Sequence, residues 1–151
     1  MFSIEAIMST NLITVSASST LAEARTLMHD NCIHHLPVID QDEQLVGLIT
    51  LTNVLAATDS FLRDTDSRIH AAEIVVDDVM VKDVATVDVR ASLRQAALFL
   101  EKHQIGCLPV MNGDTLQGII TDTDFVAVAI NLLEQIEDSE PFDGLDDADV
   151  A

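Results

Sequence analysis

The residues best suited to hold a small ligand form one short run, Gly118-Ile-Ile-Thr121-Asp-Thr-Asp124, in which an apolar stretch ends in hydroxyl and carboxylate side chains. This pattern predicts a strand that leads directly into a helix. Thr121 and Asp124 would then flank the first helical turn, where unpaired backbone N–H groups can hold an anion or a polyhydroxylated ligand. The same T-x-x-D spacing is also that of a helix cap, in which both side chains serve only the backbone.

An earlier run, Gly47-Leu-Ile-Thr50-Leu-Thr-Asn53, repeats this pattern, and the residues that precede each run repeat as well. A shift of 72 residues aligns Met8 with Met80, Thr14 with Thr86, and the Leu-Pro-Val residues 36–38 with 108–110. A one-residue deletion in the next turn reduces the shift to 71, a change of length that turns tolerate. The chain is therefore an internal duplication.

Each copy is expected to fold as β-α-β-β-α, because the strand, cap and hairpin signals occur in the same order twice. The first copy has a strand at 11–15, a capping box at Thr20-x-x-Glu23, a hairpin at 35–39 and 45–49, and a helix over about 52–62. The second has a strand at Thr86-Val87, a box at Ser92-x-x-Gln95, a hairpin at 107–111 and 116–120 turning at Asn112-Gly113, and a helix over about 123–135. Pro37 and Pro109 are expected at strand edges or bulges.

Four segments follow from this organisation. We expect a first repeat at 1–62, a polar linker at 63–75, a second repeat at 76–136 and an acidic, disordered tail at 137–151. The apolar stretch at 125–136 is too short to span a membrane and contains Asn131 and Glu134, so it is expected to be a core helix.

The charge balance excludes nucleic acid as a partner. The net charge is −19, and eleven Asp and Glu residues but no Lys or Arg follow Lys102, so phosphate contacts would be opposed at every approach. Two cysteines are too few for a disulfide framework and the first residues do not resemble a signal peptide, so a cytoplasmic location is expected. The acidic tail fits either a solvated tail or a docking segment for a basic partner.

Taken together, these motifs resemble a tandem cystathionine-beta-synthase (CBS) domain pair over about residues 4–135. The resemblance is carried by the starts that end in Met8 and Met80, the Thr-Val strands, the Leu-Pro-Val strands and the two Gly-x-x-Thr-x-Thr-Asp/Asn ends. It implies an α/β (α+β) fold of two β-α-β-β-α repeats packed through their sheets about a pseudo-twofold axis. It also implies two clefts, each of which takes an adenosine-containing ligand.

The resemblance assigns roles to individual residues. In the second copy it implies Asp124 on the ribose hydroxyls, Thr121 near phosphate, Thr86 and Leu108-Pro109-Val110 around the adenine, and Gly118 where the chain passes closely. The counterparts in the first copy are Asn53, Thr50, Thr14, Leu36-Pro37-Val38 and Gly47. Asn53 departs from the expected carboxylate. Since hydrogen bonds to charged groups contribute about 1.5–3 kcal/mol and neutral ones about 0.5–1.5, we expect roughly tenfold weaker binding there.

Other polar residues give weaker signals. Lys82, Arg90, His34 and His35 are candidate phosphate contacts, although a surface or packing role fits each of them too. Adjacent histidines on a strand point to opposite faces, which disfavours a metal site. Cys107 is interpreted as a small buried hydrophobe. The sequence contains none of the common nucleophile, phosphate-loop or Cys-x-x-Cys motifs, so we expect no enzyme and no resident cofactor.

The leading hypothesis is a stand-alone regulatory CBS pair that senses AMP, ADP, ATP or S-adenosylmethionine, with Mg²⁺ accompanying a nucleotide, and acts on an unidentified effector protein. Apolar helix residues in excess of what one short sheet can cover predict a homodimer; they are Leu55, Phe61, Leu62, Phe125, Val128 and Leu132. The alternative is a dimeric scaffold with empty clefts whose acidic tail engages a basic partner. A small hydrolase that uses Asp124 as a base is a remote third hypothesis.

Overall fold

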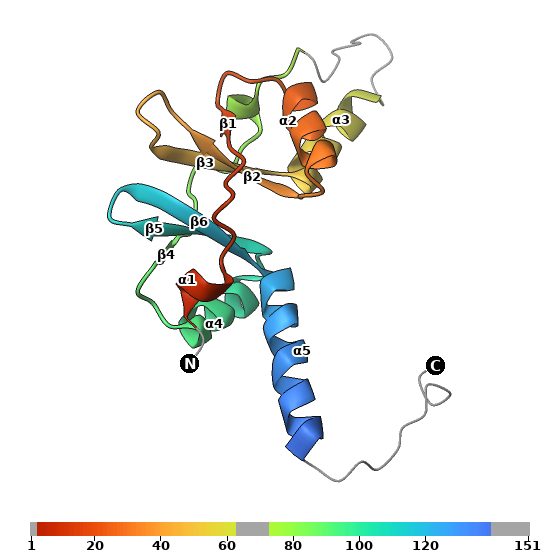
Figure 1. Ribbon diagram of the computed structural model, residues 1–151. Coiled ribbons are helices and arrows are strands. Elements are labelled where there is room, and N and C mark those ends of the chain that lie inside the picture. The colour runs from red at the N-terminus through yellow and green to blue at the C-terminus, as the bar shows by residue number, and fades with distance from the viewer. Residues whose placement is uncertain (1–2, 63–72, 140–151) are drawn as a thin grey trace.

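Each half of the chain forms a three-stranded sheet with its own helices in the computed structural model, which describes residues 3–62 and 73–139 (Figure 1). The first half contains α1 (Ile4–Ile7), β1 (Val15–Ser16), α2 (Leu21–Asp30), β2 (His35–Ile39), β3 (Leu45–Thr50) and α3 (Leu51–Leu62). The second half contains the short 3-10 helix η1 (Val76–Asp78), β4 (Val87–Asp88), α4 (Leu93–His103), β5 (Cys107–Asn112), β6 (Thr115–Thr121) and α5 (Asp122–Ser139). The predicted order β-α-β-β-α is confirmed in both halves.

The two sheets have the same topology. Their strand orders are β1-β2-β3 and β4-β5-β6, with a parallel first pair and an antiparallel hairpin in each. The first strand of the first sheet is shorter than predicted, because only Val15 and Ser16 run alongside β2. In the second sheet, β4 has the predicted two residues but begins one residue later, with Val87 and Asp88 alongside β5. The second hairpin turns through Gly113 and Asp114, one residue later than predicted, with Gly113 at φ +60°.

Pro37 and Pro109 lie in the central strands, not in edge strands. Proline is tolerated in this central strand because its nitrogen lies where neither neighbouring strand offers a hydrogen-bond partner. Leu48, opposite Pro37, uses its N–H and C=O on Val81, so the nitrogen of Pro37 is turned away from β3. On the other side, pairing with β1 begins only at Val38. No ladder hydrogen bond is therefore lost.

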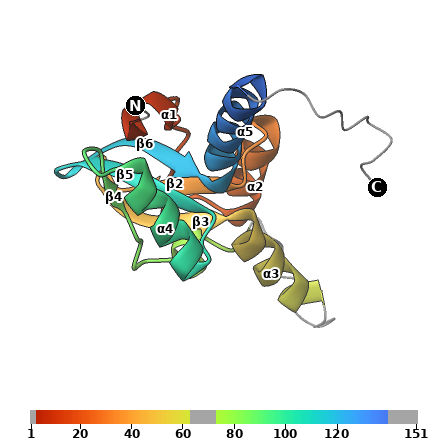
Figure 2. The same ribbon diagram turned by 90° about the horizontal axis from the view of Figure 1, so that it is seen from below.

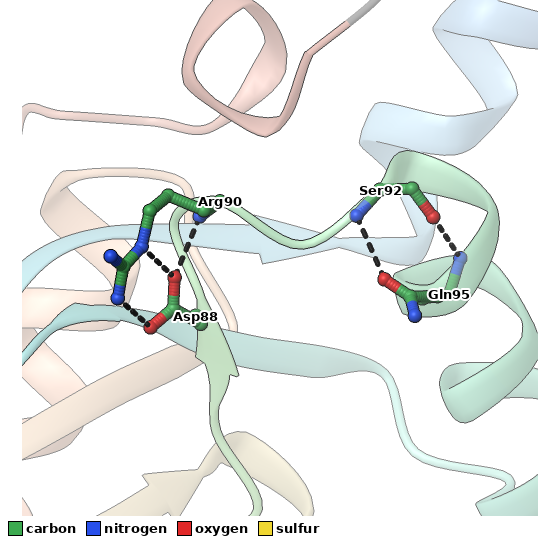
Figure 3. Close-up of polar contacts among 4 residues, drawn as sticks. All are labelled: Asp88, Arg90, Ser92 and Gln95. Carbon is green, nitrogen blue, oxygen red and sulfur yellow. Dashed lines mark hydrogen bonds and ion pairs between the residues drawn. The ribbon is translucent and has the colours of Figure 1, made fainter.

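Both predicted capping boxes are present. Thr20 accepts from the Glu23 N–H at the start of α2, and the Glu23 carboxylate accepts from the Thr20 N–H. Ser92 and Gln95 make the same reciprocal pair at the start of α4, at 3.1 and 3.0 Å (Figure 3). Both helices therefore begin where the sequence pattern places them.

The first segment of each half packs into the hydrophobic core of the other half. Ile4 of α1 is fully buried in the second core with Leu108 and Ile120, whereas Ile74 and Val76 are buried in the first core. The backbone of Ser9 pairs with Ile119 and the backbone of Val81 pairs with Leu48, which are equivalent bridges in the two copies. Seen from below, the strands of both halves lie together in the middle of the molecule (Figure 2). This reciprocal exchange is the pseudo-twofold arrangement that the resemblance implied.

Two glycines permit this close approach. A Cβ at Gly118 would lie 2.6 Å from Met8 Sδ and 3.0 Å from the Ser9 carbonyl oxygen. At Gly47 it would meet Met80 Sδ and lie 3.0 Å from the Val81 carbonyl oxygen. Gly47 and Gly118, the first residues of the two repeated runs, are thus required because a segment of the other half crosses closely over each of them.

The expectation that 125–136 forms a core helix is wrong. No residue of α5 is buried, and only its first turns reach the second core, through Phe125. The helix continues past the end of the sheet and projects from the rest of the molecule (Figure 1). No helix in the described part of the chain is both long and apolar enough to cross a membrane.

Candidate functional site

A cavity of about 340 Å³ lies where the second copy meets the first. Its walls come from the junction of β6 and α5, from the segment before β1, and from the loop that enters β2. The lining residues are Ser9, Asn11, Leu12, Ile13, Cys32, Ile33, His34, His35, Pro37, Ile119, Thr121, Asp122, Thr123 and Asp124. We call this cavity the Asp124 cleft. It combines the T-x-x-D run of the second copy with two segments of the first.

Asp124 lines the cleft, and its carboxylate also accepts a hydrogen bond from the backbone. Its Oδ2 accepts from the Thr121 N–H at 2.8 Å and from the Thr121 hydroxyl at 3.2 Å. The bond from the Thr121 N–H is the carboxylate half of the predicted helix cap, whereas the Thr121 hydroxyl bonds to side chains. No donor of the described residues lies on Oδ1, so this oxygen can accept from a ligand hydroxyl in the cleft.

Asn53, the counterpart in the first copy, leaves a different group free. Its Oδ1 accepts from the Thr50 N–H at 3.0 Å and from the Thr50 hydroxyl at 2.8 Å, which occupies both lone pairs of the amide oxygen. What remains for a ligand is the amide NH₂, a donor. Asp124 therefore leaves an acceptor where Asn53 leaves a donor, so the two equivalent positions differ in the polarity of the group that they offer as well as in charge.

His35 connects the two copies at the floor of the cleft. It is half-buried, and Gly106 lies so close that a Cβ there would be 3.2 Å from Nε2. Burial lowers the pKa of His35; Asp122 acts in the opposite direction, and His34 lowers the pKa further. The imidazole is therefore neutral at neutral pH.

We expect His35 to make the fold sensitive to acid. Its pKa is lower in the folded state than in the unfolded chain, so its contribution is fully present above about pH 6.5 and is lost as pH falls through the folded pKa. The melting temperature of His35→Gln should therefore fall less than that of the wild type between pH 7.5 and pH 5. His29→Gln, at an exposed position on α2, is the control. Equal slopes for wild type and His35→Gln would contradict this prediction.

The Asp124 cleft is poor in cations. Its lining includes the carboxylates of Asp122 and Asp124 and two histidines, but no Lys or Arg from the described residues. The two predicted cationic contacts are engaged elsewhere. Lys82 Nζ lies 3.6 Å from Asp77 Oδ1, and Arg90 forms a two-pronged pair with Asp88 at 3.1 and 3.2 Å (Figure 3). The side-chain hydrogen bond from Arg90 lowers the pKa of Asp88.

Other predicted site residues lie outside this cleft. Thr86 lines a cavity of about 440 Å³ with Lys82 and Asp83, and Thr14 lines one of about 340 Å³ beside the first hairpin turn. The side chains of Leu36, Val38, Leu108 and Val110 are fully buried in the two cores, and Pro109 is buried with them. Of the predicted set, the structure brings together Thr121, Asp124, His34, His35 and Pro37.

Sequence reasoning missed the segment 11–13 and the pair Cys32 and Ile33 as cleft residues. The segment precedes β1 and was expected to be strand, so no signal marked it as a lining element. Cys107 behaves as a buried hydrophobe: burial, and to a smaller extent Asp122, raise the pKa of its thiol to about 12. Among the described residues, no group of three or more His, Cys, Asp or Glu could hold a metal ion.

Comparison with known proteins assigns both halves of the chain to one family. The family model described as CBS domain matches twice, at residues 4–60 and 76–131. A crystal structure of a Vibrio cholerae protein assigned the name acetoin utilization protein (AcuB) is 40% identical, with a TM-score of 0.76, and the match covers 93% of this chain and 99% of that one. The structure of CBSX2 in complex with AMP is 27% identical, with a TM-score of 0.74, and the match covers 88% and 99%.

Curated relatives differ in length. A homoserine O-acetyltransferase from Methanobrevibacter ruminantium is 33% identical over 129 residues, which are 85% of this chain but 24% of that protein. An uncharacterized protein of Methanocaldococcus jannaschii is 31% identical, and the chain covers 31% of its length. The chain thus spans about a quarter to a third of these two relatives. The similarity to both relatives is confined to that part of their length.

Proposed function

Because the chain belongs to the CBS domain family, with one domain in each half, we propose that it is a regulatory module that binds an adenosine-containing ligand in the Asp124 cleft without turning it over. The observation that carries this proposal is Asp124, which lines a cavity bounded by both repeats and has one carboxylate oxygen, Oδ1, with no donor from the described residues. One carboxylate can accept from two vicinal ribose hydroxyls. The AMP complex of CBSX2 supports the ligand class.

Thermal shift with AMP, ADP, ATP and S-adenosylmethionine tests this function. A ligand at 100 times its dissociation constant stabilises by about 2.7 kcal/mol, which should raise the melting temperature by roughly 5–10 °C in a chain of this size. Inosine and deoxyadenosine are matched controls for the base and the ribose. If none of the four ligands shifts the melting temperature, the scaffold hypothesis replaces this one, and turnover of a nucleotide by pure protein would revive the hydrolase.

The charge of the cleft predicts a preference among nucleotides. Asp122 and Asp124 oppose each added phosphate, and the described lining supplies no Lys or Arg. At about 0.5–1 kcal/mol for each pair of unit charges in water-like surroundings, metal-free ATP should bind roughly tenfold more weakly than AMP. Mg²⁺ should narrow this gap, and raising the salt from low to physiological should strengthen ATP binding but not adenosine binding. Calorimetric titration would contradict this if metal-free ATP bound tightest.

We also expect a homodimer. Leu55 on α3 and Leu132 on α5 are exposed at 40% and 43%, and Val128, one turn before Leu132 on α5, is partly buried. Phe125 instead packs partly against the second core, and the side chains of Phe61 and Leu62 lie outside the described residues. Sedimentation should give twice the mass of one chain, and Leu55→Ser with Leu132→Ser should shift it toward the monomer. A monomer mass at every concentration would remove this prediction.

A further inference from the structure

A second cavity adjoins the Asp124 cleft within the first copy. It has a volume of about 590 Å³ and is lined by residues of α2 and α3, which pack together, and by the segment that enters β2 (Figure 1). Arg25 of α2 is one of these residues, and we call the space the Arg25 cavity. Cys32, Ile33 and His34 line both this cavity and the Asp124 cleft. One short segment therefore borders both spaces.

Arg25 brings a positive charge that the cleft itself lacks. The described lining of the cleft contains no Lys or Arg, whereas Arg25 lines the adjoining cavity. Its side chain is exposed, and no carboxylate of the described residues forms an ion pair with it. Lys82 and Arg90, by contrast, each pair with an aspartate. Within the described part of the chain, the guanidinium of Arg25 thus remains open to an anion of a ligand.

The charges of the two cavities differ in sign. Asp122 and Asp124 bring carboxylates to the cleft, and Arg25 lines only the adjoining cavity. A phosphate tail attached to an adenosine in the cleft would meet the two carboxylates, and like charges oppose it. A tail that is positive near the ribose and negative at its end matches the charges of the protein in both places.

We propose that the two cavities form one extended site for an adenosyl amino acid, in which Arg25 binds the terminal carboxylate. The adenosine lies in the Asp124 cleft, and a sulfonium or ammonium group of the tail lies near Asp122. The carboxylate passes the segment 32–34 and reaches Arg25, whose planar guanidinium can donate two parallel hydrogen bonds to it. This inference rests on the proposed function and names the ligand class of the same site.

Calorimetric titration with S-adenosylmethionine and 5′-methylthioadenosine tests the extended site, because the second compound keeps the adenosyl group but has no amino-acid tail. S-adenosylmethionine should bind the wild type about tenfold more tightly. Arg25→Gln should remove about three- to tenfold of this advantage, as expected for a charge-assisted contact at an exposed side chain, and leave the affinity for 5′-methylthioadenosine unchanged. Arg94→Gln is the matched control, since Arg94 is exposed on α4 and lines neither cavity.

The titrations use the full chain in its own oligomeric state. Leu55 lines the Arg25 cavity and also belongs to the predicted dimer contact, so the cavity adjoins that interface. Sedimentation of wild type and Arg25→Gln is therefore measured alongside the affinities. The two proteins should have the same mass.

Asp122→Asn gives a second readout of the same site. Asp122 Oδ1 accepts from the Thr123 N–H at 2.9 Å, and an amide oxygen can keep this bond at the start of α5. Loss of the negative charge should weaken the binding of S-adenosylmethionine several-fold and strengthen that of AMP. The two effects have opposite signs because the two ligands bring opposite charges to this position.

Three results would overturn the proposal and leave the proposed function intact. S-adenosylmethionine could bind no more tightly than 5′-methylthioadenosine. Arg25→Gln could weaken both ligands equally, which would show that Arg25 supports the fold. Arg25→Gln could also lower the mass in sedimentation without changing the preference between the ligands, which would assign Arg25 to the dimer interface. If no adenosyl ligand binds at all, the proposed function fails and this inference fails with it.

Discussion

Replacing Asp124 by alanine is expected to weaken AMP binding by about tenfold to a hundredfold, since hydrogen bonds to a charged group contribute about 1.5–3 kcal/mol. The same change removes a helix cap, because Asp124 Oδ2 accepts from the Thr121 N–H and hydroxyl. Loss of such a cap costs about 1 kcal/mol of stability. Asp124→Ala should therefore lower both the affinity, by calorimetry, and the melting temperature of the unliganded protein.

The matched control is Asp124→Asn, because the first copy already shows that an amide can keep the cap. Asn53 Oδ1 accepts both Thr50 donors in the equivalent geometry. Asp124→Asn should thus keep the melting temperature of the unliganded protein but lose about tenfold in affinity for AMP. If Asp124→Asn bound AMP as tightly as the wild type, Asp124 would be a cap and not a ligand contact. The reverse change, Asn53→Asp, should strengthen binding at the first-copy site.

Substituting alanine for Gly118 is expected to destabilise the fold by about 1–3 kcal/mol, the usual cost of overpacking a filled site. The new Cβ would lie 2.6 Å from Met8 Sδ and 3.0 Å from the Ser9 carbonyl. Met8 can rotate away, but Ser9 is held by its two hydrogen bonds to Ile119 at 2.9 and 3.0 Å. The melting temperature should fall by roughly 3–10 °C.

A double variant and a control variant show which contact destabilises Gly118→Ala. Adding Met8→Ala to Gly118→Ala relieves the sulfur contact, so the two changes should be less than additive if Met8 Sδ is the main obstacle. Thr115→Ala, at the exposed start of the same strand, should change the melting temperature much less. Because Ser9 and Ile119 also line the Asp124 cleft, Gly118→Ala should weaken AMP binding as well. An unchanged melting temperature would show that the exchanged segment moves aside freely.

The sequence by itself determined the duplication, the order of elements, both capping boxes and the T-x-x-D run. Each of these depends on residues that are close together along the chain. Thr20 and Glu23, for example, specify a cap through bonds between residues three positions apart. Strand ends and turns were less well determined, since β1 and β4 are strands only where a longer neighbour pairs with them.

Only the tertiary structure decided which copy each segment joins. The repeats are alike, so the apolar start at Ile4 has the same pattern as the start at Val76, and no local signal says that each is buried in the core of the other half. The cleft follows from that exchange, because Asp124 of the second copy lines it together with residues 11–13 and His35 of the first.

Local periodicity also does not specify how long a sheet is. An apolar pattern predicts burial of α5, but the sheet ends before the helix does, and Val126, Ile130 and Leu133 stay exposed.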